Sequence, residues 1–174
     1  MRILHVIGDL APESGGPAKA CVEMARAVAR RGHEVAIATT DYSPVRGRCT
    51  PQVAPEPGLG LHLHPVGFPR MWLTSWPLRR ALPALIGRAD IVHLHSLYLF
   101  HSWAAGTLCR RLAVPYIVRP HGTLDPVIHR RHRWRKRLME LSFQDRVLRD
   151  AAAIHYTSAE ERRLAEPYAL GAPG

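Results

Sequence analysis

Apolar residues along the chain alternate between short continuous runs and longer stretches in which they recur every three or four positions. Short runs are typical of buried strands, and the longer stretches are typical of amphipathic helices. Strands are expected at residues 2–8, 33–40, 61–66, 90–95, 115–119 and 153–157. Helices are expected at 17–31, 69–87, 98–112, 129–152 and after Ser158. This alternation predicts an α/β fold: a Rossmann-like, doubly wound parallel sheet.

Local signals support several of these boundaries. Pro17 suits the first turn of its helix, and Gly32 is placed to end it. Ser158 is expected to cap the last helix, with Glu161 three residues later completing a capping box. The stretch 41–60 is rich in Pro and Gly and has no period, which predicts a long surface loop.

The length and the cysteines limit the classes of protein. With 174 residues, the chain is expected to form a single domain over 1–174. No apolar run approaches the roughly 20 residues that cross a bilayer, and the N-terminus does not resemble a signal peptide, so a cytoplasmic location is expected. Its three cysteines are scattered, which argues against a disulfide framework and a zinc ribbon. Cys21 and Cys109 fit small core positions.

The chain is strongly basic, with a formal net charge of +10 that comes almost entirely from arginine. The charge is concentrated in the predicted helix that begins near residue 129. Four of its basic residues are candidates for a membrane or acceptor surface: Arg133, Arg135, Lys136 and Arg137. An apolar face is expected from Trp134, Leu138, Leu141 and Leu148. The alternative is a helix packed on the sheet with a solvated arginine face.

A glycine turn joins the first predicted strand to the first predicted helix. Gly15 and Gly16 let backbone approach a ligand closely, and the helix N-terminus that follows favours an anion such as a phosphate. The turn matches neither GxGxxG nor GxxxxGK[ST], which argues against a dinucleotide dehydrogenase and a P-loop NTPase. The alternative is a turn that only connects two elements.

A histidine turn follows the fifth predicted strand. Arg119, Pro120 and Gly122 surround His121, whose imidazole can donate a hydrogen bond to a sugar hydroxyl or a phosphate oxygen. A histidine bonded to backbone is the alternative. With strand order 3-2-1-4-5-6, the loops after the first, fourth and fifth strands converge on one cleft. Four residues are then expected to line it: Gly15, Gly16, His95 and His121.

Two H-x-H pairs, His62/His64 and His93/His95, each lie on one face of a predicted strand. A metal centre needs a third ligand, and none is spaced to supply it, so no metal is expected. His93 is expected to pack or hydrogen-bond within the sheet.

Four segments, in this order, resemble the N-terminal domain of the retaining, GT-B fold glycosyltransferases of family 4 (group 1). They read MRILHVIGDLAPESGGPAKACVEMARAVARRGHEVAIATT, ADIVHLHS, VPYIVRPHGTLDP and AAAIHYTSAEE. The resemblance spans nearly the whole chain. It implies the N-terminal, acceptor-side half of a GT-B fold, with the active cleft between two Rossmann-like domains.

The resemblance also implies roles and partners. Gly15 and Gly16 would lie near the donor diphosphate and the acceptor, and His121 would be the catalytic residue that contacts the transferred sugar. The substrates would be a nucleotide sugar and a glycan or lipid-linked acceptor, and no cofactor is needed. The family's nucleotide-binding C-terminal domain is not part of 1–174, so the fragment alone is expected to be inactive. The form RPHGTLDP resembles enzymes of surface polysaccharide or lipopolysaccharide biosynthesis.

Two other functions stay open from the residues alone. One is a basic, non-catalytic module that binds polyanions or the inner face of the cell membrane; nucleic acid is not expected, because the aromatic stacking pattern is absent. The other is a different Rossmann-like enzyme, such as a sugar epimerase of the same two-domain fold.

Overall fold

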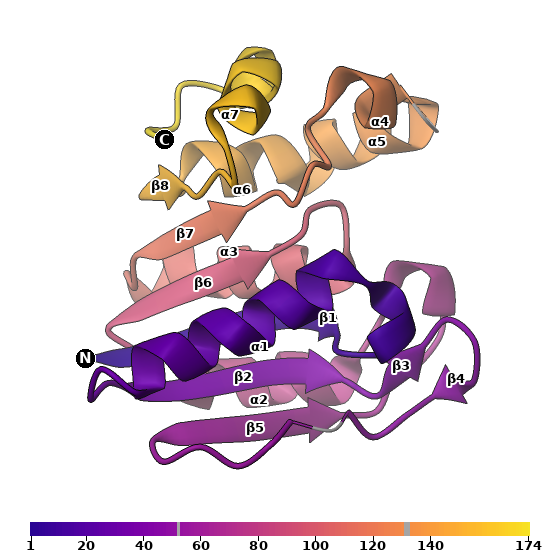
Figure 1. The fold of residues 1–174 in the computed structure, drawn as a ribbon. Coiled ribbons are helices and arrows are strands. Elements are labelled where there is room, and N and C mark those ends of the chain that lie inside the picture. Colours follow the sequence, from indigo (N-terminus) through magenta and orange to yellow (C-terminus); the bar gives the residue numbers. More distant parts are fainter. Residues whose placement is uncertain (52, 131–132) are drawn as a thin grey trace.

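A six-stranded parallel sheet forms the centre of the protein, in a computed structural model that describes residues 1–51, 53–130 and 133–174. Its strands are β1 (Arg2–Asp9), β2 (Glu34–Thr40), β5 (Leu59–His64), β6 (Ile91–His95), β7 (Tyr116–Arg119) and β8 (Ala153–Ile154). They are arranged in the order β5-β2-β1-β6-β7-β8 (Figure 1). Numbered as the sheet strands follow in the chain, this is the order 3-2-1-4-5-6 on which the expected cleft depends, and the predicted Rossmann-like α/β fold is confirmed.

Helices cover both faces of the sheet. The helices are α1 (Gly16–Ala29), α2 (Trp76–Ile86), α3 (Phe100–Leu112), α4 (Pro126–Arg130), α5 (Arg133–Met139), α6 (Asp145–Arg149) and α7 (Ala159–Ala165). Short 3-10 turns occur at Pro12–Ser14, Arg70–Trp72 and Glu166–Tyr168, and a π-helical turn at Glu140–Gln144. In Figure 1, α1 lies on the near face of the sheet, and α2 and α3 lie on the far face. Within the described ranges, every helix is too short or too polar to traverse a bilayer.

The side chains of each strand alternate between two hydrophobic clusters. On β1, Leu4 and Val6 belong to the larger cluster, which is shared with α2, α3 and α6. Ile7 belongs to the smaller cluster under α1, where Cys21 and Ala25 are fully buried. Cys21 and Cys109 are both buried, as the sequence predicts.

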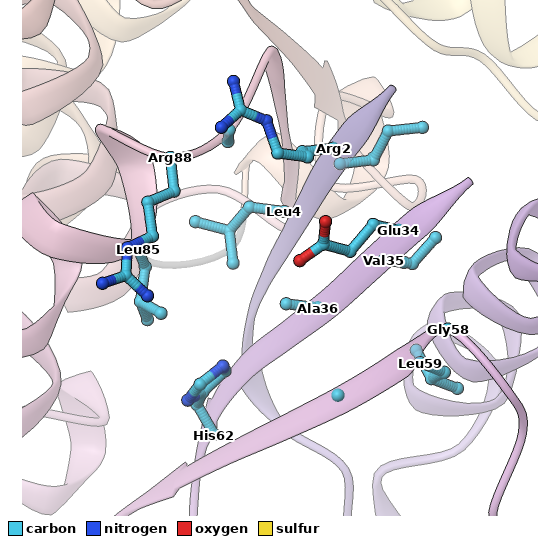
Figure 2. Close-up of a pocket in the computed structure, with 13 residues that line it drawn as sticks. Arg2, Leu4, Glu34, Val35, Ala36, Gly58, Leu59, His62, Leu85 and Arg88 are labelled. Atoms are coloured by element: carbon cyan, nitrogen blue, oxygen red, sulfur yellow. The ribbon is translucent and has the colours of Figure 1, made fainter.

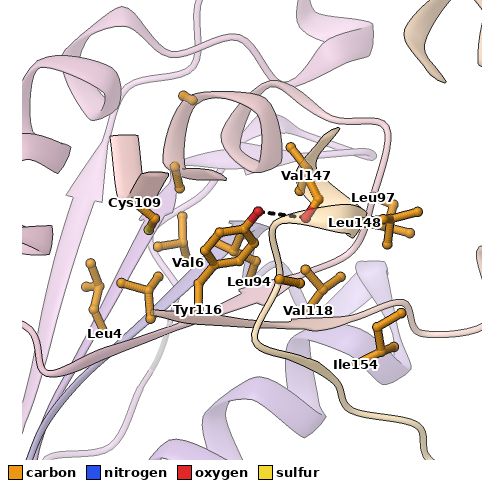
Figure 3. Packing of buried hydrophobic residues seen from close by; sticks show 14 of the residues in the cluster. Leu4, Val6, Leu94, Leu97, Cys109, Tyr116, Val118, Val147, Leu148 and Ile154 are labelled. Carbon is orange, nitrogen blue, oxygen red and sulfur yellow. Dashed lines mark hydrogen bonds between the residues drawn. The ribbon is translucent and has the colours of Figure 1, made fainter. Parts of the chain in front are cut away.

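Tyr116 connects β7 to the end of α6 within the larger cluster. Its hydroxyl donates to the carbonyl of Val147 at 2.7 Å (Figure 3). Its own carbonyl accepts from the amide of Ala152 at 2.8 Å. The last carbonyls of a helix have no partner within the helix, so the tyrosine hydroxyl satisfies one of them inside the core. This pair of bonds fixes α6 over β7.

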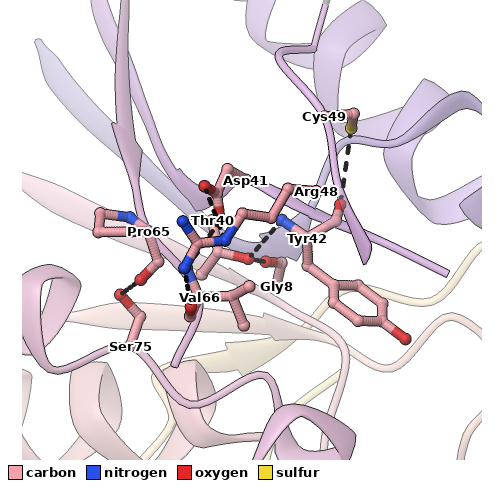
Figure 4. A network of polar contacts seen from close by, with 9 residues as sticks. All are labelled: Gly8, Thr40, Asp41, Tyr42, Arg48, Cys49, Pro65, Val66 and Ser75. Atoms are coloured by element: carbon pink, nitrogen blue, oxygen red, sulfur yellow. Dashed lines mark hydrogen bonds and ion pairs between the residues drawn. The ribbon is translucent and has the colours of Figure 1, made fainter. Parts of the chain in front are cut away.

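The stretch 41–60, predicted as a loop without regular structure, contains a short hairpin of β3 (Tyr42–Ser43) and β4 (Gly47–Arg48), and β5 already begins at Leu59. Polar bonds hold this segment to the sheet (Figure 4). Thr40 Oγ1 donates to the carbonyl of Gly8 at 2.6 Å, and the Asp41 carboxylate accepts from the amide of Val66 at 2.7 Å. Residue 52 lies outside the described residues. The prediction failed because side-chain hydrogen bonds, rather than apolar periodicity, shape the segment.

The basic helix expected over 129–152 is confirmed over most of its length. α5, the π-helical turn and α6 follow one another without a gap from Arg133 to Arg149, α4 ends at Arg130, and positions 131 and 132 lie outside the described residues. The predicted apolar face is split. Leu148 is buried in the core, whereas Trp134, Leu138 and Leu141 are 73%, 64% and 70% exposed.

Candidate functional site

A cavity of about 510 Å³ lies where the N-terminus of α1 meets the carboxyl ends of β7 and β8. Its lining comes from three separate segments: Gly16, Pro17 and Ala20; Arg119, His121, Gly122 and Asp125; and Thr157, Glu161 and Leu164. The expectation that the glycine turn and the histidine turn open onto one crevice is therefore confirmed. In open α/β sheets, ligands bind at this rim.

The two glycines of the first turn have different positions. Gly15 caps α1 with a φ of 76°, a conformation that favours glycine, and it does not line the cavity. Gly16 lines the cavity and has no positive φ, and a Cβ built on it meets no atom within 4 Å. In the first turn of α1, the amides of Gly16 and Ala18 have no intrahelical carbonyl to bond. The turn therefore presents open space and free N–H groups at the cavity.

Arg119 brings a positive charge to the cavity wall. Its Nη1 approaches Met24 Sδ at 3.9 Å, and its buried Nε has no hydrogen-bond partner in the described part of the chain. Among residues 1–51, 53–130 and 133–174, no carboxylate lies within ion-pair distance of it. A partly buried guanidinium without an acidic partner is suited to bind an anion.

The histidine turn is held in a strained but fixed conformation. His121 and Gly122 have φ values of 53° and 76°. The turn is closed by the Thr123 hydroxyl, which donates to the Pro120 carbonyl at 2.8 Å, and by the buried side chain of Leu124. A left-handed conformation at a non-glycine residue persists only where its surroundings enforce it. The turn is thus organised before any ligand arrives.

Glu161 connects this turn to α7. Its carboxylate accepts from the amide of Gly122 at 2.7 Å, and from the amide and hydroxyl of Thr157, both at 2.6 Å. Burial by itself would raise the pKa of Glu161, but the hydrogen bonds from Thr157 and Gly122 outweigh it and lower the pKa. Ser158 Oγ accepts from the Glu161 amide, as the predicted capping box requires. The other half of the box differs, because the carboxylate bonds to Thr157 and Gly122.

Behind the cavity, one face of the sheet carries histidines where aliphatic side chains would be usual. His5 pairs with His93 across β1 and β6, and His95 follows two residues later on the same face. All three are buried, and His95 is fully buried. The expectation that His95 lines the cleft is therefore wrong: its ring lies behind His121. The prediction that His93 packs within the sheet is confirmed.

The buried rings are linked to the cavity. His5 Nδ1 lies 3.0 Å from His95 Nε2, and His95 Nδ1 lies 3.0 Å from His121 Nε2. His101 Nε2 donates to the carbonyl of His95 at 2.6 Å, which holds the end of β6. We call His5, His95 and His121 the imidazole chain.

These imidazoles are neutral at pH 7. Burial, with a smaller contribution from the charge of Arg119, lowers the pKa of His5 and that of His121 to about 4 each. Burial, followed by the effect of neighbouring histidines, lowers the pKa of His93 to about 2 and that of His95 well below its usual value. Arg119 therefore supplies the positive charge here, and the histidines supply uncharged hydrogen-bonding groups.

His5, His93 and His95 also form a possible metal-ligand group, with one nitrogen of each within 4.8 Å of the others. The expectation that no third ligand exists was wrong, because His5 comes from a neighbouring strand. The set still fits a divalent cation poorly. It contains no carboxylate, Arg119 is close enough to depress the pKa of all three rings, and His5 and His95 bond to each other. Absence of a metal stays a prediction.

A second cavity, of about 380 Å³, lies at the amino ends of β1 and β2, near the end of α2. Arg2, Leu4, Glu34, His62 and Arg88 surround it (Figure 2). Parallel sheets rarely place ligands at this rim, so the cavity beside His121 is the better candidate.

The predicted basic surface residues have different surroundings. Lys136 donates to the carbonyl of Ile128 at 2.7 Å and lies 5.2 Å from the ring centroid of Tyr98, so it supports the local structure. Its proposed surface role does not fit these contacts. Arg137 lies 3.7 Å from the carboxylate of Glu140, and Arg135 Nη2 contacts Met71 Sδ at 3.3 Å.

We expect acid to destabilise the protein through its buried histidines. The folded-state pKa of His5 and of His101 is about 4, below the usual 6.5, so the unfolded state binds more protons between these values. The contribution of these neutral histidines to the free energy of unfolding is complete above pH 6.5 and is lost as the pH falls towards 4. Urea unfolding should show a loss of about 2 kcal/mol per such histidine between pH 7 and pH 5. His101→Gln should reduce this pH dependence, and an equal stability at both pH values would contradict the account.

A second prediction concerns the Glu161 carboxylate. Glu161→Gln replaces one acceptor oxygen by an NH₂ group, which faces an N–H donor instead of accepting from it. The free energy of unfolding should fall by about 1–3 kcal/mol in chemical denaturation. The control is Glu160→Gln, because Glu160 is exposed and, within the described part of the chain, pairs with Arg163 on the same helix, so this variant should leave the free energy of unfolding nearly unchanged. Equal effects of the two variants would exclude the bridging role.

Solved structures share this fold at low sequence identity. Sucrose-phosphate synthase from Thermosynechococcus elongatus is 15% identical in sequence and superimposes with a TM-score of 0.63. The aligned part is 99% of this chain and 46% of the synthase chain. HepE from Anabaena, in complex with UDP and glucose, is 12% identical and superimposes with a TM-score of 0.59. The aligned part is 99% of this chain and 41% of the HepE chain. The chain thus spans less than half the length of these proteins. No curated protein matches it by sequence.

The family comparison is more extensive. Residues 15–173 match the family described as glycosyl transferase 4-like domain. The match begins at the glycine turn and includes every residue that lines the cavity beside His121. The chain belongs to the glycosyl transferase 4-like domain family, and it forms the N-terminal Rossmann-like domain of a GT-B fold.

Proposed function

We propose that this domain is part of a retaining glycosyltransferase that transfers a hexosyl group from a nucleotide sugar to a glycan or lipid-linked acceptor in surface polysaccharide or lipopolysaccharide biosynthesis. In this proposal the cavity beside His121 holds the donor phosphates and the transferred sugar. Arg119 and the first-turn amides of α1 interact with the leaving diphosphate, and His121 hydrogen-bonds the sugar. No cofactor takes part.

The observation that carries the proposal is the glycine at position 16. Glycine in a helix costs up to about 1 kcal/mol relative to alanine, and the backbone of Gly16 does not require it. A Cβ here would meet open space, so no neighbour in the domain excludes a larger residue. Close approach of a ligand to the backbone explains the glycine, and the unpaired charge of Arg119 supports an anionic ligand.

Solved relatives of the fold support the class of donor. HepE was solved with UDP and glucose, with UDP-glucose, and with UDP. We infer that this domain likewise acts on a uridine or similar nucleotide sugar. The epimerase alternative is less well supported, because the matched family is a glycosyltransferase family.

A second domain is needed to complete the site. The cavity has groups for phosphate and sugar, and its described lining residues include no Phe, Tyr or Trp on which a nucleobase could stack. We propose that a C-terminal domain binds the base and ribose across the cleft, and that the 174 residues alone do not sustain turnover.

The test is transfer from radiolabelled nucleotide sugars by the complete enzyme, with Gly16→Ala as the variant. The added methyl group should displace the donor and lower kcat/KM by about 10²-fold, with little change in the melting temperature. The matched control is Gly60→Ala, since Gly60 also lines a cavity and its Cβ would make only an ordinary contact 3.9 Å from the Val35 carbonyl. That variant should keep full activity.

Unchanged transfer by Gly16→Ala would contradict the placement of the donor, and absence of any transfer with all common nucleotide sugars would contradict the proposed class of reaction. His121→Ala should also lower kcat by about 10²-fold, because it removes a hydrogen bond at the reacting sugar.

We also propose that the exposed face of α5 and the π-helical turn contacts an anionic membrane surface near the acceptor. Trp134, Leu138 and Leu141 are spaced as one helical stripe and are strongly exposed, and Arg133 and Arg137 are nearby. This segment lies towards the carboxyl ends of the strands, the same side as the histidine turn (Figure 1). An aromatic and aliphatic stripe flanked by arginines favours a lipid interface over a purely solvated helix.

Vesicle sedimentation tests the membrane proposal. Binding to vesicles with anionic lipid should exceed binding to neutral vesicles, and replacing Leu138 and Leu141 by serine should reduce it about tenfold or more. Substitution of two exposed arginines elsewhere, Arg30 and Arg163, by serine is the control for net charge. Wild-type binding by the leucine variant together with weaker binding by the arginine variant would mean that total charge alone drives it, and the surface would then be excluded.

A further inference from the structure

The imidazole chain runs from beneath α1 to the cavity wall. His5 belongs to β1, His95 ends β6, and His121 follows β7, so three strands contribute one ring each. The two links are both 3.0 Å long. His5 and His95 are shielded from solvent, whereas His121 is partly exposed at the cavity. His95 uses both ring nitrogens in these contacts.

Neutral imidazoles impose a direction on such a chain. Each ring carries one N–H donor and one bare nitrogen acceptor. Since both nitrogens of His95 are engaged, it must donate to one neighbour and accept from the other. The hydrogens therefore all point outwards, from His5 to His121, or all point inwards.

The buried end of the chain distinguishes the two directions. His5 Nε2 is buried and has no hydrogen-bond partner among the described residues. The outward direction leaves this atom a bare acceptor, and the inward direction leaves it an N–H. Buried N–H groups without an acceptor are rarer than buried acceptors without a donor. The outward direction is therefore the less costly one.

A neighbouring ring follows the same rule. His101 must carry its hydrogen on Nε2, because that atom contacts the carbonyl of His95 and a carbonyl only accepts. Its Nδ1 is then a bare nitrogen, and it is likewise buried and unpartnered among the described residues. This part of the fold thus already leaves an imidazole acceptor unpaired.

We propose that His5 and His95 are positioning residues that hold His121 as its Nδ1–H tautomer, so that the one ring nitrogen left for a ligand is a hydrogen-bond donor. An isolated histidine side chain favours the Nε2–H form, so the chain reverses the intrinsic preference of His121. A donor at this position suits a phosphate or sugar oxygen. The identity of that ligand rests on the proposed function, whereas the tautomer does not.

Nitrogen NMR of the 174-residue chain labelled with 15N-histidine measures the tautomer without any ligand. At pH 7, His121 should show a protonated, pyrrole-type Nδ1 and a bare, pyridine-type Nε2. His95 should show the same pattern. A pyrrole-type Nε2 at His121 would overturn the proposal, whatever the behaviour of any variant.

Variants then test what sets the tautomer. His95→Phe keeps a ring in the core and removes both nitrogens, so His121 should change to mainly Nε2–H. The matched control is His155→Phe, because His155 stacks on His93 at 5.3 Å but supplies no nitrogen to the chain. In the His155→Phe variant, His121 should remain the Nδ1–H tautomer, as in the wild type. An unchanged tautomer in folded His95→Phe would overturn the positioning role. If that variant does not fold, His5→Phe replaces it, and it should give a mixture of both tautomers at His121.

Adding a nucleotide ligand or Zn²⁺ to the NMR sample separates the positioning role from the proposed function and from metal binding. In the complete enzyme, UDP-glucose should shift the Nδ1 resonance of His121; a missing response with the Nδ1–H form intact would contradict the proposed function and still support the positioning role. One equivalent of Zn²⁺ should leave the spectrum unchanged. Stoichiometric shifts of His5, His93 and His95 would identify a metal centre that uses the same nitrogens, and would overturn the hydrogen-bonded chain.

Discussion

The two-residue alternation of side chains across a buried parallel sheet is the constraint on which the rest of this structure depends. On one face it places Leu4, Val6, Leu94 and Val118 in the larger hydrophobic cluster. On the other face the same alternation buries polar side chains. Those side chains lose their water, and they keep a low energy only by remaining uncharged and by bonding to one another.

The chemistry of the cavity follows from this burial. Neutral imidazoles lie near the guanidinium of Arg119, which contributes to the lowered pKa of His5, His93, His95 and His121. The arrangement separates charge from hydrogen bonding: the arginine attracts an anion, and the histidines supply directional contacts without adding charge. The rim of the sheet concentrates both in one place, because the ends of β6 and β7 are adjacent.

The α/β elements could be predicted from the sequence, because apolar periodicity and the turn residues Gly15, Gly16 and Gly122 report local conformation directly. The shared crevice followed from assuming the Rossmann strand order, which the sheet has. The contacts of His5 could not be predicted from the sequence. His5 lies in an ordinary strand pattern, and only the register that pairs it with His93 shows that three imidazoles meet. The prediction that His95 faces the cleft was wrong for a similar reason, since its position at a strand end did not reveal that the histidine turn lies over it. The π-helical turn inside the basic helix could not be predicted, because it keeps a helical pattern of residues.

One carboxylate, that of Glu161, bonds both to the turn that carries His121 and to the segment that opens α7. Two walls of the cavity are therefore connected through a single side chain. Any domain that docks against α7 would transmit its movement to the histidine turn over a distance of one side chain. A displacement of α7 would therefore strain the bonds to Gly122 and Thr157 together rather than one after the other.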